Sequence, residues 1–299
     1  METIIETCGL TKSYRWKEAV HDLDIRLTAG RACAFLGRNG AGKTTTIKML
    51  AGLIRPTSGQ SFLFGRDSRS LRPEDWQKTG YVSENQELYD WMTGRELIDF
   101  TAALYPTWDR EFERELIAKL ELPLSRRISR CSRGEKVKLA LLLAMAFRPR
   151  LLILDEPFAG LDPLTRSDFL DSVLEITRQN EWSIFFSAHD IDDVEKLADD
   201  VVIIDEGRLQ VSESLDSLQE RFRRVDIVGN HPPVTESTAI LGLTREGDHS
   251  RFVHSAFDGQ TETALQASYP GASISISTMS LKEIFIALAR KFQRETQRV

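Results

Sequence analysis

A glycine-rich run near the N-terminus has the residues needed to bind phosphate groups. It reads Gly37-Arg38-Asn39-Gly40-Ala41-Gly42-Lys43-Thr44, followed by Thr45, and it lies between an apolar strand-like run and a helix-like stretch. Glycines let successive backbone N–H groups turn toward phosphate oxygens, and a helix start adds partial positive charge. In this pattern Lys43 reaches the β and γ phosphates, and the Thr44 hydroxyl ligates Mg²⁺. The run therefore predicts a nucleotide-phosphate site.

Two carboxylates end a second apolar run. The residues Leu151-Leu152-Ile153-Leu154 are typical of a buried strand, and Asp155 and Glu156 follow directly. Asp155 is suited to hold Mg²⁺, and Glu156 to orient or deprotonate the water that attacks the terminal phosphate. A strand whose acidic end only reaches solvent would look the same. The functional interpretation therefore depends on the phosphate-binding run.

The elements that must position these residues alternate between strands and helices through about residue 210, which indicates a parallel α/β sheet. Strands are expected around Phe35 and Leu36 and at residues 151–154, 183–187 and 201–205. Helices are expected from about 42 to 50 and within 93–147. After Gly207, strands are expected at 225–228, 238–243, 251–257 and 273–277, with a closing helix capped by Ser280 and Glu283. We predict an α/β P-loop NTPase domain over residues 1–210 with a helical subdomain at about 85–150, and a small C-terminal α+β domain over 211–299.

The composition is that of an ordinary globular protein. The chain has 299 residues, 41% hydrophobic and 28% charged, and its net charge is −6. This charge disfavours nucleic acid as a partner, because such partners usually meet a basic face. The longest apolar stretch, 139–147, is shorter than the roughly 18 residues that cross a bilayer, and the N-terminus has no secretory signal. Cys8, Cys33 and Cys131 show no paired spacing, which indicates reduced thiols in the cytoplasm.

A third motif identifies the family that the chain resembles. Cys131-Ser132-Arg133-Gly134-Glu135, at the head of a helix, is similar to the Leu-Ser-Gly-Gly-Gln signature of ABC (ATP-binding cassette) proteins. The resemblance covers residues 3 to about 210, and Arg133 and Glu135 resemble the antibiotic-export branch. It implies the ABC ATPase fold, with ATP and Mg²⁺ as ligands. It also implies that Ser132 and Gly134 bind the γ-phosphate of ATP held by a partner subunit. Ser132 and Glu135 also fit a plain capping box.

The resemblance implies roles for further residues. Tyr14 would stack on adenine, although an aromatic residue at that position more often packs against the rest of the protein. Asp162 would lie in the loop that crosses to the partner, and His189 would contact the γ-phosphate and the catalytic carboxylate. Glu84 stands where the family has glutamine. Its carboxylate oxygen suits Mg²⁺, while Gln86 is the alternative after a shift of two positions.

The function implied by the resemblance is ATP hydrolysis that powers a membrane exporter. Two subunits, identical or different, would close face to face on ATP and reopen after hydrolysis. An integral-membrane permease on another chain would hold the subunit at the inner face of the cell membrane. Tyr89, Trp91 and Met92 are candidates for that contact, unless they pack within the helical subdomain.

Two other functions are consistent with a phosphate-binding run of this kind. One is a soluble ABC ATPase that acts on nucleic acid or ribosomes, but such relatives carry coiled-coil insertions or two cassettes in one chain. The other is a P-loop kinase, but a kinase mechanism would give no role to the signature motif or to His189.

Overall fold

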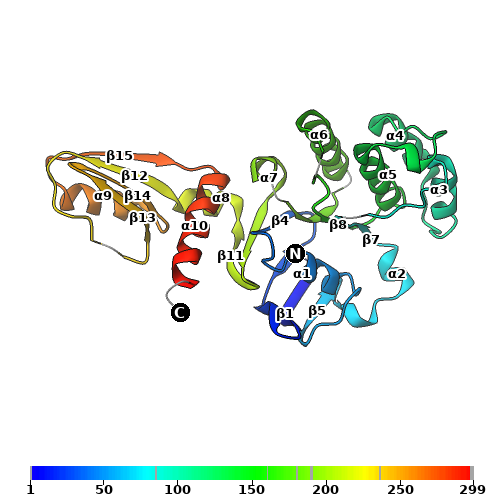
Figure 1. The fold of residues 1–299 in the computed structure, drawn as a ribbon, viewed down its shortest axis with the longest axis horizontal. Coiled ribbons are helices and arrows are strands. Elements are labelled where there is room, and N and C mark those ends of the chain that lie inside the picture. Colours follow the sequence, from blue (N-terminus) through cyan, green and yellow to red (C-terminus); the bar gives the residue numbers. More distant parts are fainter. Residues whose placement is uncertain are drawn as a thin grey trace. The chain divides into compact units, whose positions relative to one another are not determined.

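The computed structural model describes residues 2–84, 86–159, 161–179, 181–188, 191–235 and 237–296 (Figure 1). The chain divides into two compact units, Met1–Ser212 and Glu213–Val299. No helix of the described residues is both long and apolar enough to cross a membrane.

The larger unit is built on a mainly parallel sheet with the strand order β11-β10-β4-β9-β8-β7. Neighbouring strands from β10 to β7 run parallel. These strands are almost continuously apolar and buried, as expected when helices cover both faces of a sheet. The sheet strands are β4 (Ala32–Gly37), β7 (Thr79–Val82), β8 (Leu151–Asp155), β9 (Ser183–Ser187), β10 (Asp200–Asp205) and β11 (Arg208–Ser214). The accompanying helices are α1 (Lys43–Leu50), α6 (Pro163–Gln179) and α7 (Ile191–Leu197). The predicted parallel α/β core is confirmed.

A second sheet is antiparallel, and its strands come from the chain segments before and after α1. The sequence pattern did not predict this sheet. Its strand order is β2-β1-β5-β6, with β3 paired to β1. The strands are β1 (Thr3–Tyr14), β2 (Lys17–Leu23), β3 (Arg26–Thr28), β5 (Ser58–Leu63) and β6 (Arg66–Asp67), followed by a 3₁₀ turn (Ser68–Ser70) and α2 (Pro73–Trp76). Polar residues interrupt these half-buried strands, so the apolar runs are short. Ile5, Leu10 and Leu63 nevertheless pack into one core with Phe35 and Phe185 of the parallel sheet.

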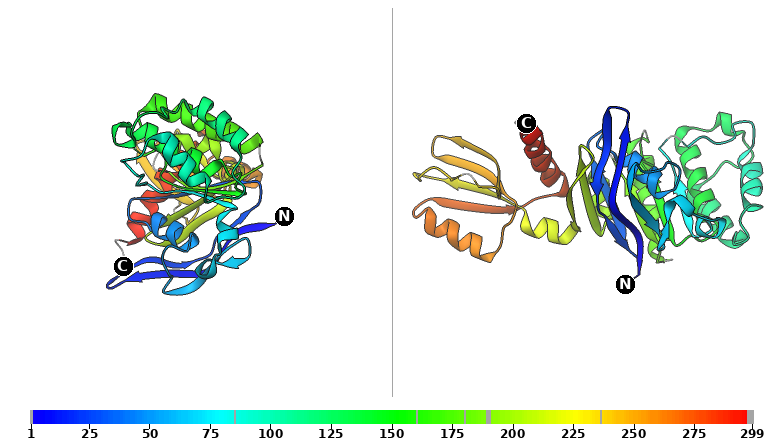
Figure 2. Two further views of the ribbon diagram at one scale, coloured as in Figure 1. Left: turned by 90° about the vertical axis from the view of Figure 1, so that its right-hand side faces the viewer. Right: turned by 90° about the horizontal axis from the view of Figure 1, so that it is seen from below.

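The helical subdomain consists of α3 (Gly94–Ala102), α4 (Arg110–Leu120), a 3₁₀ turn (Ile128–Arg130) and α5 (Arg133–Met145). These helices group beside β7, on which α5 packs (Figures 1 and 2). The nearly buried carboxylate of Glu113 in α4 accepts hydrogen bonds from Arg95 (2.7 Å), Trp108 (2.8 Å) and Arg110 (2.7 Å). Although burial opposes ionisation, these donors keep the pKa of Glu113 below its usual value. The three donors thereby tie α3, α4 and the loop between them together.

The C-terminal unit is an antiparallel sheet with the strand order β13-β14-β12-β15 and flanking helices. Its elements are α8 (Leu215–Arg221), β12 (Arg223–Val228), β13 (Ile240–Glu246), β14 (His249–His254), α9 (Gly259–Ser268), β15 (Ser273–Thr278) and α10 (Leu281–Thr296). Val225, Ile227 and Phe252 form its buried core with Tyr269. The predicted α+β fold is confirmed, although α9 was not predicted because no residue of that helix is buried.

Candidate nucleotide site

The glycine-rich run forms the turn between β4 and α1, at the carboxyl edge of the parallel sheet. Gly42 has a φ of +105°, and a Cβ there would lie 2.4 Å from the carbonyl oxygen of Ala19. A side chain is therefore excluded both by backbone conformation and by space. The Lys43 ammonium is buried and donates to the Gly37 carbonyl oxygen at 2.9 Å. The loop thus surrounds a charged group that points into its own concave side.

A cavity of about 500 Å³ lies at this turn, within the size range of small-molecule sites. Its lining residues are Tyr14, Lys17, Ala19, Asn39, Gly40, Gly42, Lys43, Thr44, Thr45, Glu84, Glu156 and Ala159. Most of the predicted phosphate-binding residues therefore meet Tyr14, Glu84 and Glu156 at one place. The Tyr14 ring is half exposed and lies 5.0 Å from the Lys12 ammonium, which is a cation–π distance.

The Asp155 carboxylate is buried beside the cavity. One oxygen, Oδ1, accepts hydrogen bonds from Thr44 (3.2 Å) and Ser187 (2.9 Å). The other, Oδ2, is buried and has no hydrogen-bond partner among the described residues. Burial raises the pKa of Asp155; the two hydroxyl donors lower it, and the nearby Glu84 and Glu156 carboxylates raise it again. An unshared carboxylate oxygen next to a threonine hydroxyl is a donor set that fits Mg²⁺.

Glu156 faces the phosphate-binding lysine. Its backbone is left-handed, with a φ of +50°. Its Oε1 lies 3.2 Å from Lys43 Nζ, and both side chains are largely buried. The ion pair links the turn after β4 to the end of β8.

Ser187 is a functional candidate that the sequence analysis missed. Its hydroxyl donates to Asp155 Oδ1 at 2.9 Å and accepts the Glu156 backbone N–H at 2.9 Å. The side chain is fully buried at the end of β9, whose parallel register pairs Ser187 with Asp155. The only advance signal was its place at the end of a predicted strand. Lys17, paired with Tyr14 across the β1–β2 hairpin, was also missed, because the sequence pattern did not predict these two strands.

The structure distinguishes between Glu84 and Gln86. Glu84 follows β7 and lines the cavity. The Gln86 Oε1 instead accepts hydrogen bonds from the Ser83 amide (3.2 Å) and the Ser83 hydroxyl (3.0 Å), and Gln86 is not among the lining residues. On β7 itself, the buried Tyr81 hydroxyl has no hydrogen-bond partner among the described residues, and burial and the nearby Asp155 raise the pKa of Tyr81 to about 12.

Several predicted site residues lie away from this cavity. Ser132 and Gly134 begin α5, where Ser132 accepts the Glu135 N–H (3.2 Å) and Glu135 accepts the Ser132 N–H (2.7 Å), the predicted capping box. Asp162 is exposed just before α6. Ser132, Gly134 and Asp162 do not line the cavity. Three residues of the glycine-rich run also do not line the cavity: Gly37, Arg38, which is exposed, and Ala41, which is buried. His189 lies outside the described residues.

Comparisons with known proteins agree with this geometry. Residues 20–159 match the ABC transporter family. The bacitracin transport ATP-binding protein BcrA of Bacillus licheniformis is 37% identical over 75% of this chain and 74% of its own length. The molybdenum import ATP-binding protein ModC of Paramagnetospirillum magneticum is 32% identical over 92% of this chain and 77% of its own length. A solved ATP-binding subunit of an ABC transporter superposes with a TM-score of 0.64 at 29% identity, covering 73% of this chain and 92% of that subunit.

The fold, the phosphate-binding turn and the relatives lead to one assignment. The chain belongs to the ABC transporter family, as an ATP-binding subunit that hydrolyses ATP with Mg²⁺.

Proposed function

We propose that this ATPase powers export through a separate integral-membrane permease, which holds it at the inner face of the cell membrane. The observation that carries the ATPase chemistry is that the P-loop contacts both carboxylates at the end of β8, Lys43 pairing with Glu156 and Thr44 donating to Asp155. Export is supported by the signature residues Arg133 and Glu135 and by the 37% identity to a bacitracin transport protein. Import is the second candidate, because the molybdenum import relative extends over 92% of the chain.

The residues in and beside the cavity have separate roles in phosphoryl transfer. ATP with Mg²⁺ supplies the phosphoryl group that is transferred in line to water. The amides of the glycine-rich run and Lys43 bind phosphate oxygens, and Tyr14 stacks on the base. Thr44, Asp155 and Glu84 hold the metal, with Asp155 Oδ2 as the unshared oxygen. His189 is assigned to the γ-phosphate by family resemblance alone.

Glu156 orients or deprotonates the attacking water. Its carboxylate is paired with Lys43 at 3.2 Å. Phosphate oxygens compete for the same ammonium, because charge-assisted hydrogen bonds to phosphate are strong. Binding of phosphate at Lys43 therefore releases Glu156 for its role as the base.

The complete site is proposed to form between two cassettes, in a homodimer or with another ABC ATPase. Ser132 and Gly134 lie at a helix N-terminus, which attracts anions, yet they do not line the cavity of their own chain. Asp162 is likewise exposed outside that cavity. Residues that belong to an ATP site but lie outside their own chain's cavity are available to a partner. Within each chain, residues 1–210 are the ATPase domain and 211–299 an accessory domain.

The test is Glu156→Gln, which removes the proposed base but keeps the shape of the side chain. We expect ATP binding to persist while turnover falls by about 10²- to 10⁴-fold, the usual contribution of general-base catalysis. ATP should then trap a dimer visible by light scattering. Glu206→Gln is the matched control, because Glu206 also follows a parallel strand in the left-handed region (φ 46°) but does not line the cavity. Turnover near wild type in Glu156→Gln would overturn the assignment.

A further inference from the structure

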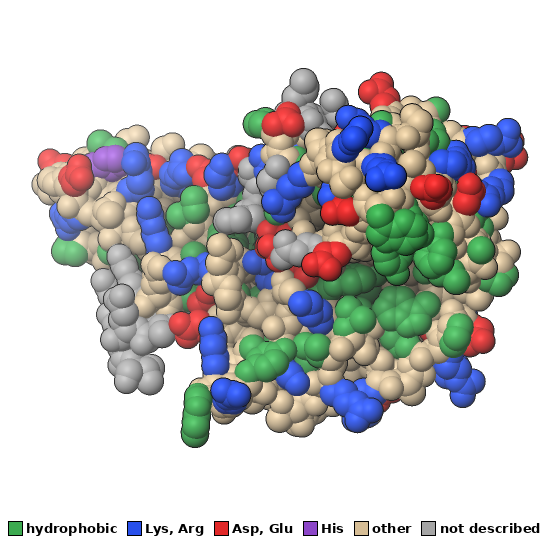
Figure 3. Space-filling view, turned by 45° about the vertical axis from the view of Figure 1, so that its right-hand side comes forward, with side chains coloured by type: hydrophobic (Ala, Val, Ile, Leu, Met, Phe, Trp, Pro, Cys, Tyr) green, Lys and Arg blue, Asp and Glu red, His purple; other side chains and the backbone are tan. Residues whose placement is uncertain are grey.

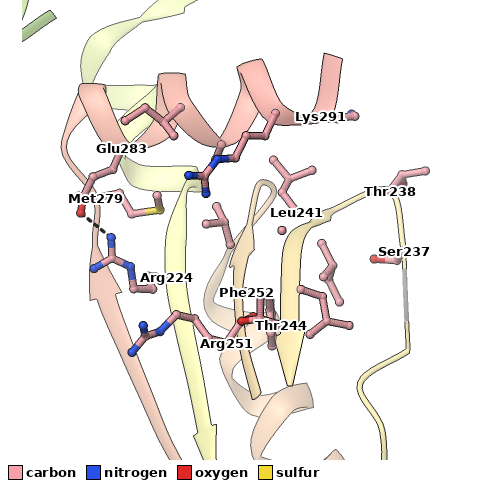
Figure 4. A pocket seen from close by; sticks show the side chains of 17 residues that line it. Arg224, Ser237, Thr238, Leu241, Thr244, Arg251, Phe252, Met279, Glu283 and Lys291 are labelled. Atoms are coloured by element: carbon pink, nitrogen blue, oxygen red, sulfur yellow. Dashed lines mark hydrogen bonds and ion pairs between the residues drawn. The ribbon is translucent and has the colours of Figure 1, made fainter. Parts of the chain in front are cut away.

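A second, larger cavity lies within the C-terminal unit. It has a volume of about 930 Å³ and is enclosed by α10 on one side and strands β12, β13 and β14 on the other (Figure 4). This volume is at the upper end of the range typical of ligand sites. The cavity shares no lining residue with the nucleotide site.

The helix wall comes from a second stripe of α10. The stripe that packs into the unit is Leu281, Ile284, Leu288 and Phe292, all buried. The residues that line the cavity are Glu283, Ile286, Ala287, Arg290 and Lys291, which repeat at the spacing of one helix face. The buried stripe is therefore sufficient to pack α10 onto the unit, and the second stripe is not needed for that packing. Ile286 remains 42% exposed on the second stripe, as a large apolar side chain that borders the cavity.

The sheet wall presents an apolar row that ends in a cation. Leu241 pairs with Val253 across β13 and β14, and Val253 pairs with Arg224 across β14 and β12. Paired residues share a face, so the three side chains stand in a row, and all of them line the cavity. Leu241 lies between the sheet and the helix in Figure 4. The cavity thus has an apolar centre formed by Leu241, Val253 and Ile286.

The charged residues of the cavity are predominantly basic. Among the described lining residues, Arg224, Arg251, Arg290 and Lys291 are cations, and Glu283 is the one acid. Arg224 pairs with Glu283, while Arg251 donates to Asp226 at 2.7 Å, so carboxylates orient both arginines. Arg290 and Lys291 add positive charge at the last turns of the helix stripe. In a chain of net charge −6, this local excess of cations favours an anion.

We propose that this cavity binds a small dissolved amphipathic anion, with an apolar body and one phosphate or carboxylate head. The body contacts Leu241, Val253 and Ile286, and the head lies near Arg290 and the neighbouring cations. The enclosure between helix and sheet favours a dissolved molecule over a flat membrane surface. The proposal does not depend on the direction of transport.

Titration calorimetry of the full chain with hexyl phosphate tests the site, with hexanol and inorganic phosphate as partial ligands. We expect saturable one-to-one binding of hexyl phosphate and much weaker binding of either partial ligand. Arg290→Glu should weaken binding by about tenfold or more, since a charge-assisted contact becomes repulsive. Ala287→Trp should abolish binding by filling the cavity. Lys282→Glu is the matched control on α10, because Lys282 is exposed and does not line the cavity.

Thermal unfolding and ATPase activity establish that each variant is folded. If Ala287→Trp does not fold, the hexyl phosphate affinity of Arg290→Glu tests the proposal. Arg290→Lys, which keeps the positive charge, should then bind hexyl phosphate nearly as well as wild type. The absence of hexyl phosphate binding overturns the proposal, as does equal binding of hexanol or unchanged binding by Arg290→Glu. Binding that is seen only with phosphatidylglycerol vesicles, and not with hexyl phosphate, would assign the cations to a membrane surface and would also refute it.

Discussion

At the scale of single residues, the Ser187 hydroxyl connects the two carboxylates of the nucleotide site. Its one proton goes to Asp155 and its lone pair accepts the Glu156 N–H. The first contact orients Asp155 so that Oδ2 stays unshared, and the second holds Glu156 in its left-handed backbone conformation. Ser187 is therefore a positioning residue that acts through both neighbours.

Replacing Ser187 with alanine should lower kcat by about 10- to 100-fold, because small displacements of catalytic groups are costly. The lost hydrogen bond normally lowers the pKa of Asp155, so its removal raises that pKa. The acidic limb of the pH–rate profile should consequently move to higher pH, and more Mg²⁺ should be required. Ser187→Thr, which keeps the hydroxyl, should restore both properties.

Ser183→Ala is the matched control. Ser183 is also buried on β9, but at the opposite end, where its hydroxyl accepts the Gly30 N–H at 2.8 Å. A purely structural effect would lower thermal stability in both variants and leave the Mg²⁺ and pH dependence alone. Identical profiles for Ser187→Ala and wild type would remove Ser187 from the mechanism.

Residue types and linear spacing predicted much of this site, but not its hydrogen bonds. Lys43 and Thr44 are recognisable because the phosphate-binding turn is contiguous in sequence. Ser187 is not, since its role arises from the parallel register between β8 and β9. The choice between Glu84 and Gln86 was open in the sequence because both are polar. We favour Glu84 because it lines the cavity, whereas Gln86 accepts hydrogen bonds from Ser83.

At the scale of elements, buried parallel strands were predictable and half-buried antiparallel ones were not. β8 and β9 are buried along their whole length and have continuous apolar runs, Leu151–Leu154 and Ile184–Phe186, so they stand out from the sequence. β1 alternates exposed and buried residues irregularly and contains register shifts, which obscure the period of two. Its partner strands lie on both sides of α1 in sequence. The sheet that carries Tyr14 is therefore defined by long-range pairing.

The helical subdomain exposes aromatic side chains that we assign to the membrane partner. Tyr89 and Trp91 are 52% and 68% exposed, and the Tyr89 ring lies 6.1 Å from Trp91 and 5.9 Å from Phe100. Figure 3 shows hydrophobic side chains gathered on the surface of the larger unit. Met92 is only 8% exposed, so its interpretation as a contact residue was wrong and it packs inside the subdomain.

Trp91→Asp should abolish co-purification with the permease and leave the basal ATPase activity of the isolated subunit unchanged. The reason is that an exposed aromatic anchor contributes to an interface and not to the subunit's own core. The matched control is Trp16→Asp, since Trp16 is 98% exposed at the β1–β2 turn, far along the chain from the helical subdomain. Normal permease binding by Trp91→Asp would contradict the assignment.

At the scale of the whole molecule, the chain carries two separate parts of an ATP site. Most of the P-loop and Glu156 line one cavity, and Asp155 is buried beside it, whereas Ser132 begins α5 outside it. No described residue of the signature motif reaches that cavity. A second cassette would supply the missing side of the γ-phosphate, and ATP would then join the two subunits. In this proposed arrangement, hydrolysis would be a property of the dimer.

A mixed dimer of one Lys43→Ala chain and one Ser132→Arg chain tests this sharing, with Glu156→Gln in both chains to trap bound ATP. If sites are built across subunits, both lesions fall in one site and the other stays intact, so one ATP per dimer should be retained. If each site is built within one chain, each chain carries a lesion and no ATP should be retained. Differently tagged chains allow the mixed species to be isolated, and bound nucleotide is then counted alongside phosphate release. The two parental dimers are the controls: each has one lesion in every site and should retain none, while thermal unfolding shows that both are folded. Retention of no ATP by a folded mixed dimer would refute the shared site, because the intact pairing of Lys43 with a partner Ser132 would then bind nothing.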